Sequence, residues 1–429
     1  MILEQEKAKH PKNKWLVIFS LVFAGEMIFG LPFHISRFFR PTLMEVFHLS
    51  HTDLGDIFAV YGIAAMIAYF PGGVIADRFS DRKLMTIALL ATGIGGFYML
   101  QIPGQTGLSL LFGYWGVSTI LLFWAAMLRA TRLWGGEKQQ GEAFGILDGG
   151  RGLVAALVAW AAVIIFGNML SGDIQSSSID EQTKALQAVI ALYIAMTFLA
   201  AGLIWFLIPE SKNTESDSFA KSFKGIKKVL RNRVVWLQAA IVITAYCGYR
   251  SLDYYSLYAV EVLGMDDLSA SKFVSNAAFL RPVAAVAAGF LADRISASKV
   301  IGRLFAVLIV VFILLALIKP TSFGEQIIYA NLLITFAAVY GIRGVYFALL
   351  SETQIKLNLT GTAIGVISVI GYTPDIFFAS LAGRILDADP GIVGYQHLFQ
   401  LMAVFAAIGL IAIFGLRFSK TRTHKKFVV

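Results

Sequence analysis

Apolar residues along this chain gather in twelve long runs that short polar segments separate. Each run has about the 20 residues that a helix needs to cross ~30 Å of hydrocarbon. A helix also satisfies its own backbone hydrogen bonds inside the bilayer. The pattern therefore predicts an all-α integral membrane protein whose transmembrane helices lie at residues 15–38, 54–77, 83–101, 107–129, 142–168, 186–208, 235–262, 270–293, 299–318, 326–350, 361–385 and 396–416.

Lysine and arginine divide unequally between the segments that join these runs. Most of the 36 basic residues lie in the N-terminal segment, after the even-numbered runs and in the C-terminal tail. Basic segments stay on the cytoplasmic side of a membrane. We therefore predict a multi-pass protein of the cytoplasmic (inner) membrane with both termini in the cytoplasm. The same distribution explains the net charge of +9 without a nucleic-acid partner.

One phrase occurs twice. GVIADRFSDRK at residues 73–83 returns as GFLADRISASK at residues 289–299, and the Asp residues lie 216 positions apart in a chain of 429. A duplicated membrane bundle is the layout of a secondary transporter. We predict two pseudo-symmetric six-helix bundles, 1–208 and 235–429, joined by a cytoplasmic linker at 209–234. The linker pattern predicts an amphipathic interfacial helix, with a partner-binding segment as the alternative.

Both copies of the phrase place charges where a transmembrane run ends. Such a cluster can hold the cytoplasmic side shut and must break for that side to open. The alternative is that these charges only orient the helices at the membrane surface. We predict a cytoplasmic gate formed by Gly73, Asp77, Arg78, Arg82, Gly289, Asp293 and Arg294.

This phrase resembles the loop motif of the major facilitator superfamily, roughly G-x-x-x-D-R-x-G-R-R. Ser80 and Ser296 stand where the motif has Gly, and Asp81 stands where a basic residue is common. Two further phrases, GEAFGILDGGRGL and GYTPDIFFASLAGRILDADPGIVGY, resemble a group that includes a carrier assigned to the bacterial sulfoquinovose pathway. The resemblance to organophosphate–phosphate antiporters is more distant. It implies an arginine on helices 1 and 7, where this chain has His34, with Arg37 three residues on, and Arg250.

Charged residues within the runs are costly, at roughly 2.5–3.5 kcal/mol each on insertion scales, so each needs an explanation. Arg250 and His34 occupy equivalent positions of the repeat and are expected to converge on a central cavity. Arginine offers a planar set of donors to carboxylate, sulfonate or phosphate. The alternatives are that Arg250 pairs with Asp253 and that His34 caps a helix. The predicted substrate-binding residues are Arg250, His34, Arg151, Arg281 and Arg37, and Arg343 is placed toward the cytoplasmic end of its run.

Three acids within the runs are candidates for proton coupling. Glu26 is an isolated acid near the middle of the first run, and Asp375 follows Pro374 at a predicted kink. Asp148 lies three residues before Arg151 on the same helix face, so protonation of Asp148 would free Arg151. Each acid could instead be the fixed counter-ion of a neighbouring arginine.

The composition limits the function further. Hydrophobic residues make up 57% and charged residues 15%, which is too apolar for a soluble protein, and Cys247 has no partner for a disulfide. The sequence shows no P-loop, dinucleotide fingerprint or zinc-type cluster, so we expect no enzyme activity and no cofactor.

These observations predict a monomeric secondary transporter. It would move a small organic anion (a sugar phosphate, sulfonate or carboxylate) by alternating access, coupled to a proton or to a counter-anion. The first alternative is a proton-driven exporter of drugs or lipophiles, and the second is a transporter-like receptor.

Overall fold

The computed structural model describes residues 14–135, 140–170, 178–210, 229–319, 324–352 and 360–425, and every regular element in these ranges is helical. The first half contains α1 (Lys14–Met27), α2 (Ile35–Phe38), α3 (Arg40–Val46), α4 (His51–Arg78), α5 (Asp81–Met99), α6 (Gln105–Val117), α7 (Ala125–Gly135), α8 (Gln140–Asn168) and α9 (Ile179–Leu207). The second half contains α11 (Arg233–Ser251), α12 (Tyr255–Glu261), α13 (Asp267–Ala278), α14 (Leu280–Ile295), α15 (Ala297–Leu317), α16 (Gly324–Val345), α17 (Thr360–Gly371), α18 (Pro374–Ala388) and α19 (Ile392–Lys425).

Each of the twelve predicted spans coincides with one helix or with consecutive helices of this order. Within the described residues, nine spans are long and apolar enough to cross a membrane, and the pair α1 and Gly30–Phe38, bent by 43°, makes a tenth. The remaining two predicted spans are α5, which opens on the charges of Asp81–Lys83, and α11 with α12, which the 3-10 turn Leu252–Tyr254 interrupts. Local charge and a broken helix explain why these two look less apolar.

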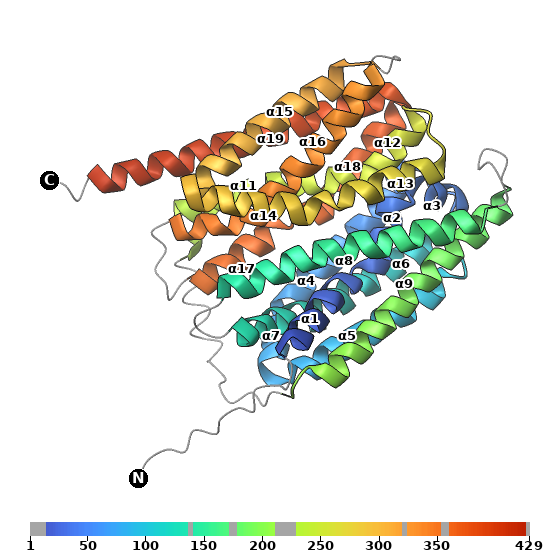
Figure 1. The fold of residues 1–429 in the computed structure, drawn as a ribbon, viewed down its shortest axis with the longest axis horizontal. Helices are drawn as coiled ribbons and strands as arrows, with labels where there is room; N and C mark the ends of the chain where they lie inside the picture. The colour runs from blue at the N-terminus through green and yellow to red at the C-terminus, as the bar shows by residue number, and fades with distance from the viewer. Residues whose placement is uncertain are drawn as a thin grey trace, which may run out of the picture.

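The two halves lie side by side with their helices running in broadly the same direction (Figure 1). Helices α1–α9 form one bundle and α11–α19 the other, and the start of α1 and the end of α19 lie toward the same end of the molecule. Helices α2, α3, α12 and α13 gather at the opposite end, which we call the sealed end.

The halves touch closely toward the sealed end, where α4 packs along α18. A Cβ atom at Gly62 would overlap the backbone of Asp375, and one at Gly383 would overlap the backbone of His51. The Asp387 carboxylate accepts the backbone N–H groups of His51 (3.1 Å) and Thr52 (2.7 Å), so one half caps a helix of the other.

Several helices depart from regular α-helical geometry where the two halves face each other. The backbone is π-helical at Gly30–His34 and Ser118–Trp124, and 3-10 helical at Leu252–Tyr254 and Tyr346–Glu352. Pro32 lies in the first of these segments, and Pro374 begins α18 after a break at Tyr372 and Thr373. Such breaks recur at functional sites because they re-aim side chains.

The gate predicted at the other end is only partly described. Arg82 and Lys83 each contact Glu210 at 2.7 Å, and buried Asp81 binds Arg129 at 2.6 Å. Arg78, Asp293 and Arg294 are exposed, and Gly289 lies in α14. The Asp77 side chain, the surroundings of Gly73 and most of the predicted linker helix lie outside the described residues. The gate and the division into domains therefore stay predictions.

The two copies of the repeated phrase differ in the backbone at the position where the motif has Gly. Ser296 joins α14 to α15 at φ 109°, a conformation that favours glycine, whereas Ser80 has φ −62°. We expect Ser296→Gly to raise the free energy of unfolding by about 1 kcal/mol by removing strain. Ser80→Gly should lower it by about 0.5 kcal/mol, since there Gly only adds backbone entropy to the unfolded chain. Thermal unfolding of the two variants in detergent checks this, and equal shifts would contradict it.

Candidate functional site

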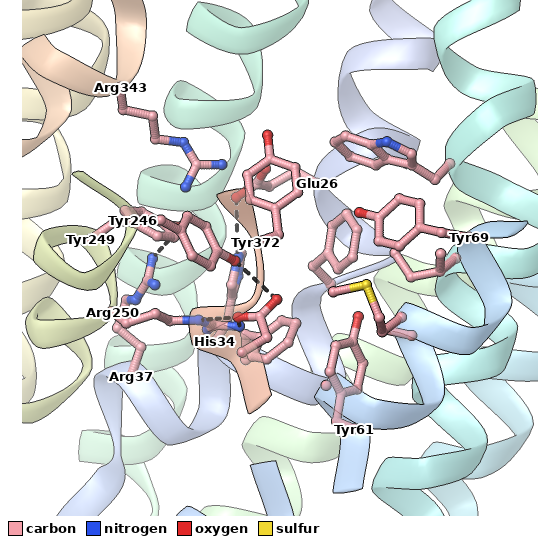
Figure 2. A pocket seen from close by; sticks show the side chains of 18 of the residues that line it. Glu26, His34, Arg37, Tyr61, Tyr69, Tyr246, Tyr249, Arg250, Arg343 and Tyr372 are labelled. Atoms are coloured by element: carbon pink, nitrogen blue, oxygen red, sulfur yellow. Dashed lines mark hydrogen bonds and ion pairs between the residues drawn. The ribbon is translucent and has the colours of Figure 1, made fainter. Parts of the chain in front are cut away.

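A cavity of about 740 Å³, including its open mouth, lies between the two halves on the chain-terminal side of the sealed end. Figure 2 shows Arg343, Tyr246, Tyr249 and Arg250 on one side and Tyr61 and Tyr69 on the other. The lining combines aromatic rings with charged groups: Glu26, Phe29, Phe33, His34, Arg37, Tyr61, Tyr69, Trp124, Arg151, Tyr246, Tyr249, Arg250, Arg343, Tyr372 and Asp375.

The first charged network centres on Glu26, which is only 3% exposed. Its Oε2 accepts from Arg151 Nε at 3.0 Å, and its Oε1 lies 3.1 Å from Arg281 Nη1 and 3.2 Å from His34 Nε2. Arg281 Nη2 reaches on to Asp148 at 3.4 Å. With His34 neutral, two guanidinium groups face two carboxylates. This network, defined by Glu26, His34, Arg151, Arg281 and Asp148, is therefore electrically neutral.

The second network runs from the seal to the cavity. Arg37 of the first half binds Asp253 of the second half, and its Nη1 donates to Tyr249 at 2.7 Å. The other oxygen of Asp253 accepts from Arg250 Nη1 at 3.2 Å, and Arg250 Nε donates to Asp375 at 2.6 Å. This network of Arg37, Asp253, Arg250 and Asp375 also balances two positive charges with two negative ones.

Arg343 differs from every other arginine that lines the cavity. Its guanidinium lies 3.9 Å from the centre of the Tyr249 ring, and its Nη1 is buried without a hydrogen-bond partner. No described acid lies within ion-pair distance of it. In Figure 2 it projects toward the cavity and no dashed line reaches it. Arg343 is thus the single uncompensated cation among the described residues that line the site.

The structure brings most of the predicted site residues together. His34, Arg37, Arg151, Arg250, Glu26 and Asp375 all line the cavity, while Arg281 and Asp148 belong to the first network without lining the cavity. Their roles as substrate-binding and proton-coupling groups stay predictions.

Two expectations about partners are corrected. Glu26 is not isolated, because three cationic or basic groups surround it. Asp148 binds Arg281 from the other half, whereas Arg151, its expected helix-face partner, binds Glu26. Glu26, on α1, contacts Arg151 of α8 and Arg281 of α14 at once. The alternative pairing of Arg250 with Asp253 is present, and Asp375 adds a second carboxylate to Arg250.

Sequence reasoning gave too little weight to two features of the site. It gave Arg343 no specific role, although an arginine within an apolar run was a visible signal. It also did not pair Arg37 with Asp253, although these residues are 216 positions apart, the offset of the repeat. Equivalent positions meet near a pseudo-two-fold axis, and opposite charges there can bind one another across it.

Comparison with known proteins bears on the family. The Major Facilitator Superfamily model matches residues 21–379. Inner membrane protein YihN of Escherichia coli (strain K12) is 30% identical over 413 residues, which cover 93% of this chain and 94% of YihN. Inner membrane protein YqcE of the same organism is 29% identical over 423 residues, or 96% of each chain. A hexuronate transporter of Bacillus subtilis (strain 168) is 22% identical over 422 residues, or 93% of this chain and 94% of that one.

Solved structures show the same fold. The crystal structure of nucleoside transporter NupG superposes with a TM-score of 0.69, covering 94% of this chain and 99% of NupG at 14% identity. The family match covers most of the chain, and the relatives and the fold agree with it. The chain therefore belongs to the major facilitator superfamily: it is a twelve-helix membrane transporter in two six-helix bundles, and it is not an enzyme.

Proposed function

We propose that this transporter carries a small organic anion by alternating access. The observation that carries the proposal is Arg343, the uncompensated guanidinium beside two neutral networks. Arg343 is half-buried, and its Nη1 is buried without a partner, which is unfavourable, so an anionic ligand that pairs with this donor gains energy on binding. Arginine also offers paired donors to carboxylate, sulfonate or phosphate oxygens.

The remainder of the lining supports an organic body on that anion. Aromatic rings of Phe29, Trp124, Tyr69 and Tyr372 face the cavity and can pack against a sugar or another flat group. The relative named as a hexuronate transporter supports an anionic sugar acid. For an exporter of cationic drugs the same lining is unfavourable, because both carboxylates that face the cavity, Glu26 and Asp375, already bind arginine.

The coupling and the setting are part of the same proposal. Asp375 or Glu26 would carry the proton in proton-coupled transport, and in exchange a second anion would take its place. The chain would work as a monomer in the inner membrane, with both termini cytoplasmic and the sealed end external.

The proposal is tested by thermal unfolding of detergent-purified protein against sugar carboxylates, sulfonates, sulfates and phosphates, with lipophilic cations beside them. A ligand that binds only the folded state raises its stability by ~2.7 kcal/mol at a hundredfold excess over Kd. We expect anions to raise the unfolding temperature of the wild type and to lose at least tenfold in affinity in Arg343→Gln. An arginine–carboxylate bond is worth about 1.5–3 kcal/mol, which gives that factor.

The matched control is Arg303→Gln, which removes an exposed arginine of α15 far from the cavity lining. It should bind anions as the wild type does. Stabilisation by lipophilic cations alone would overturn the proposal and favour the exporter. Unchanged anion affinity in Arg343→Gln would remove Arg343 as the anchor.

A further inference from the structure

The charges around the cavity indicate how many negative charges the transported anion carries. This inference rests on the proposed anion transport. Among the described residues, each ion-pair network contains two guanidinium groups and two carboxylates. Arg343 stands outside both networks. The site therefore offers one unsatisfied positive charge to a ligand.

A second negative charge on the ligand would meet no free cation there. Arg151 and Arg250 already bind carboxylates at 3.0 and 2.6 Å, and Arg37 binds Asp253 and Tyr249. A dianion would have to displace one of these carboxylates or lose water around a charge that stays unpaired. Both are costly in a partly dehydrated site, where charges interact more strongly than in water.

One member of the networks is held less firmly than the others. Asp148 lies 3.4 Å from Arg281 and its side chain is 37% exposed, whereas the side chains of Glu26, Arg281 and Asp253 are at most 7% exposed. Asp148 and Glu26 are the carboxylates that bind Arg281. The negative charge of Asp148 therefore lowers the positive potential that a ligand at Arg343 would experience.

We infer that the cavity selects anions with a single negative charge, and that Asp148 sets this preference by neutralising Arg281. Asp148 is a positioning residue in this scheme, because it acts through Arg281 and Arg343. With Asp148 neutral, the first network would carry one unbalanced positive charge. The affinity of the cavity for a dianion would then be closer to its affinity for a monoanion.

Matched esters that differ by one charge test the valence. Glucose, glycerol and 4-nitrophenol are each offered as the sulfate ester, a monoanion, and as the phosphate ester, largely a dianion at pH 7.5. For carboxylates the pair is glucuronate and glucarate. Affinities come from thermal unfolding titrations of the full chain. We expect each monoanion that binds to do so at least tenfold more tightly than its dianionic partner.

A change of pH provides a control within the same titrations. The second pKa of an alkyl phosphate ester, such as those of glucose and glycerol, is about 6, so at pH 5 most of that ester carries one negative charge. Phosphate esters should then approach the affinity of the sulfate esters, which keep their charge. Phosphates that bind as tightly as sulfates at pH 7.5 would overturn the valence inference and leave anion transport standing. Failure of every anion would overturn the proposed function itself.

The role of Asp148 is tested by the ratio of the two affinities, which a merely structural effect would not change. Asp148→Asn should narrow the preference for sulfate over phosphate by about tenfold, since removal of one nearby charge is worth about one decade in affinity. Asp180→Asn, which neutralises an exposed acid in the first turn of α9, should leave the ratio unchanged. An unaltered ratio in Asp148→Asn would remove this residue from the selection.

Discussion

Glu26→Gln is expected to destabilise the folded protein by about 3–5 kcal/mol, because it leaves a buried positive charge uncompensated. In the wild type, Glu26 accepts from Arg151 at 3.0 Å and Arg281 at 3.1 Å, and all three side chains are at most 8% exposed. In the same orientation, a neutral amide presents its oxygen to only one of the two guanidinium groups and its NH2 group, which cannot accept, to the other. The network would then carry an uncompensated positive charge around a side chain that is only 3% exposed.

Thermal unfolding in detergent measures this loss, and a second substitution identifies its cause. Removing Arg281 as well, in Glu26→Gln/Arg281→Gln, restores neutrality between Arg151 and Asp148. We therefore expect the double variant to recover a large part of the stability, in a non-additive cycle. Additive losses would mean that the single substitution acts through packing and not through charge.

The same experiment bears on the coupling proposal. If Glu26 carries the coupling proton, its neutral form is part of the transport cycle and Gln should be tolerated with exchange intact. If Glu26 is a fixed counter-ion, the folded state should suffer as described above. Its three close contacts favour the second role, which makes Asp375 the stronger candidate for the proton. Asp375 lines the cavity and contacts Arg250 and Tyr246, the latter at 3.2 Å.

The sequence was enough to predict the helices, the repeat and the presence of a charged cavity. Apolar runs of spanning length correspond to helices because each must satisfy its backbone inside the bilayer. Even the spans that are locally less apolar, α5 and the broken α11, follow this rule.

The pairing of charges was not predictable in the same way. Whether Asp148 meets Arg151 or Arg281 depends on how α8 is rotated against α14. Whether Glu26 stands alone depends on how α1 is oriented toward α8 and α14, which the apolar pattern does not encode. The importance of Arg343 depends on the acids that are missing around it. The absence of an acid on a neighbouring helix cannot be predicted from the spacing of residues along one helix.

The ion pair between Arg37 and Asp253 leads to the second large prediction, which concerns the seal. The pair joins the two halves at equivalent positions of the repeat, and the two side chains are only 6% and 7% exposed. Ser256 donates to the Arg37 carbonyl at 3.0 Å, and Thr42 donates to Asp267 at 2.6 Å nearby. An alternating-access cycle must break these contacts to open the sealed end.

Asp253→Asn is therefore expected to shift the conformational balance toward the state open at the sealed end. Loss of one partner of a buried pair costs about 3–5 kcal/mol, and every 1.4 kcal/mol is tenfold in an equilibrium constant. The sealed state alone contains this contact between the halves, so the open population should rise at least about a hundredfold. Ala379 lines a small cavity beneath the seal and serves as the reporter position.

The measurement is the rate at which a membrane-impermeant thiol reagent modifies Ala379→Cys in a Cys247→Ala background, with reagent on the sealed-end side. Asp253→Asn should accelerate labelling strongly. In Arg37→Gln/Asp253→Asn the labelling rate should return part of the way to the wild-type value, because no uncompensated charge remains at the seal. Asp56→Asn is the matched control: its pair with Arg384 also joins the two halves, yet both side chains are about half exposed, and water screens such pairs. Equal acceleration by both single substitutions would mean that any contact between the halves acts as a latch. Acceleration by Asp253→Asn alone would show that the buried charge at the repeat axis holds the sealed state closed.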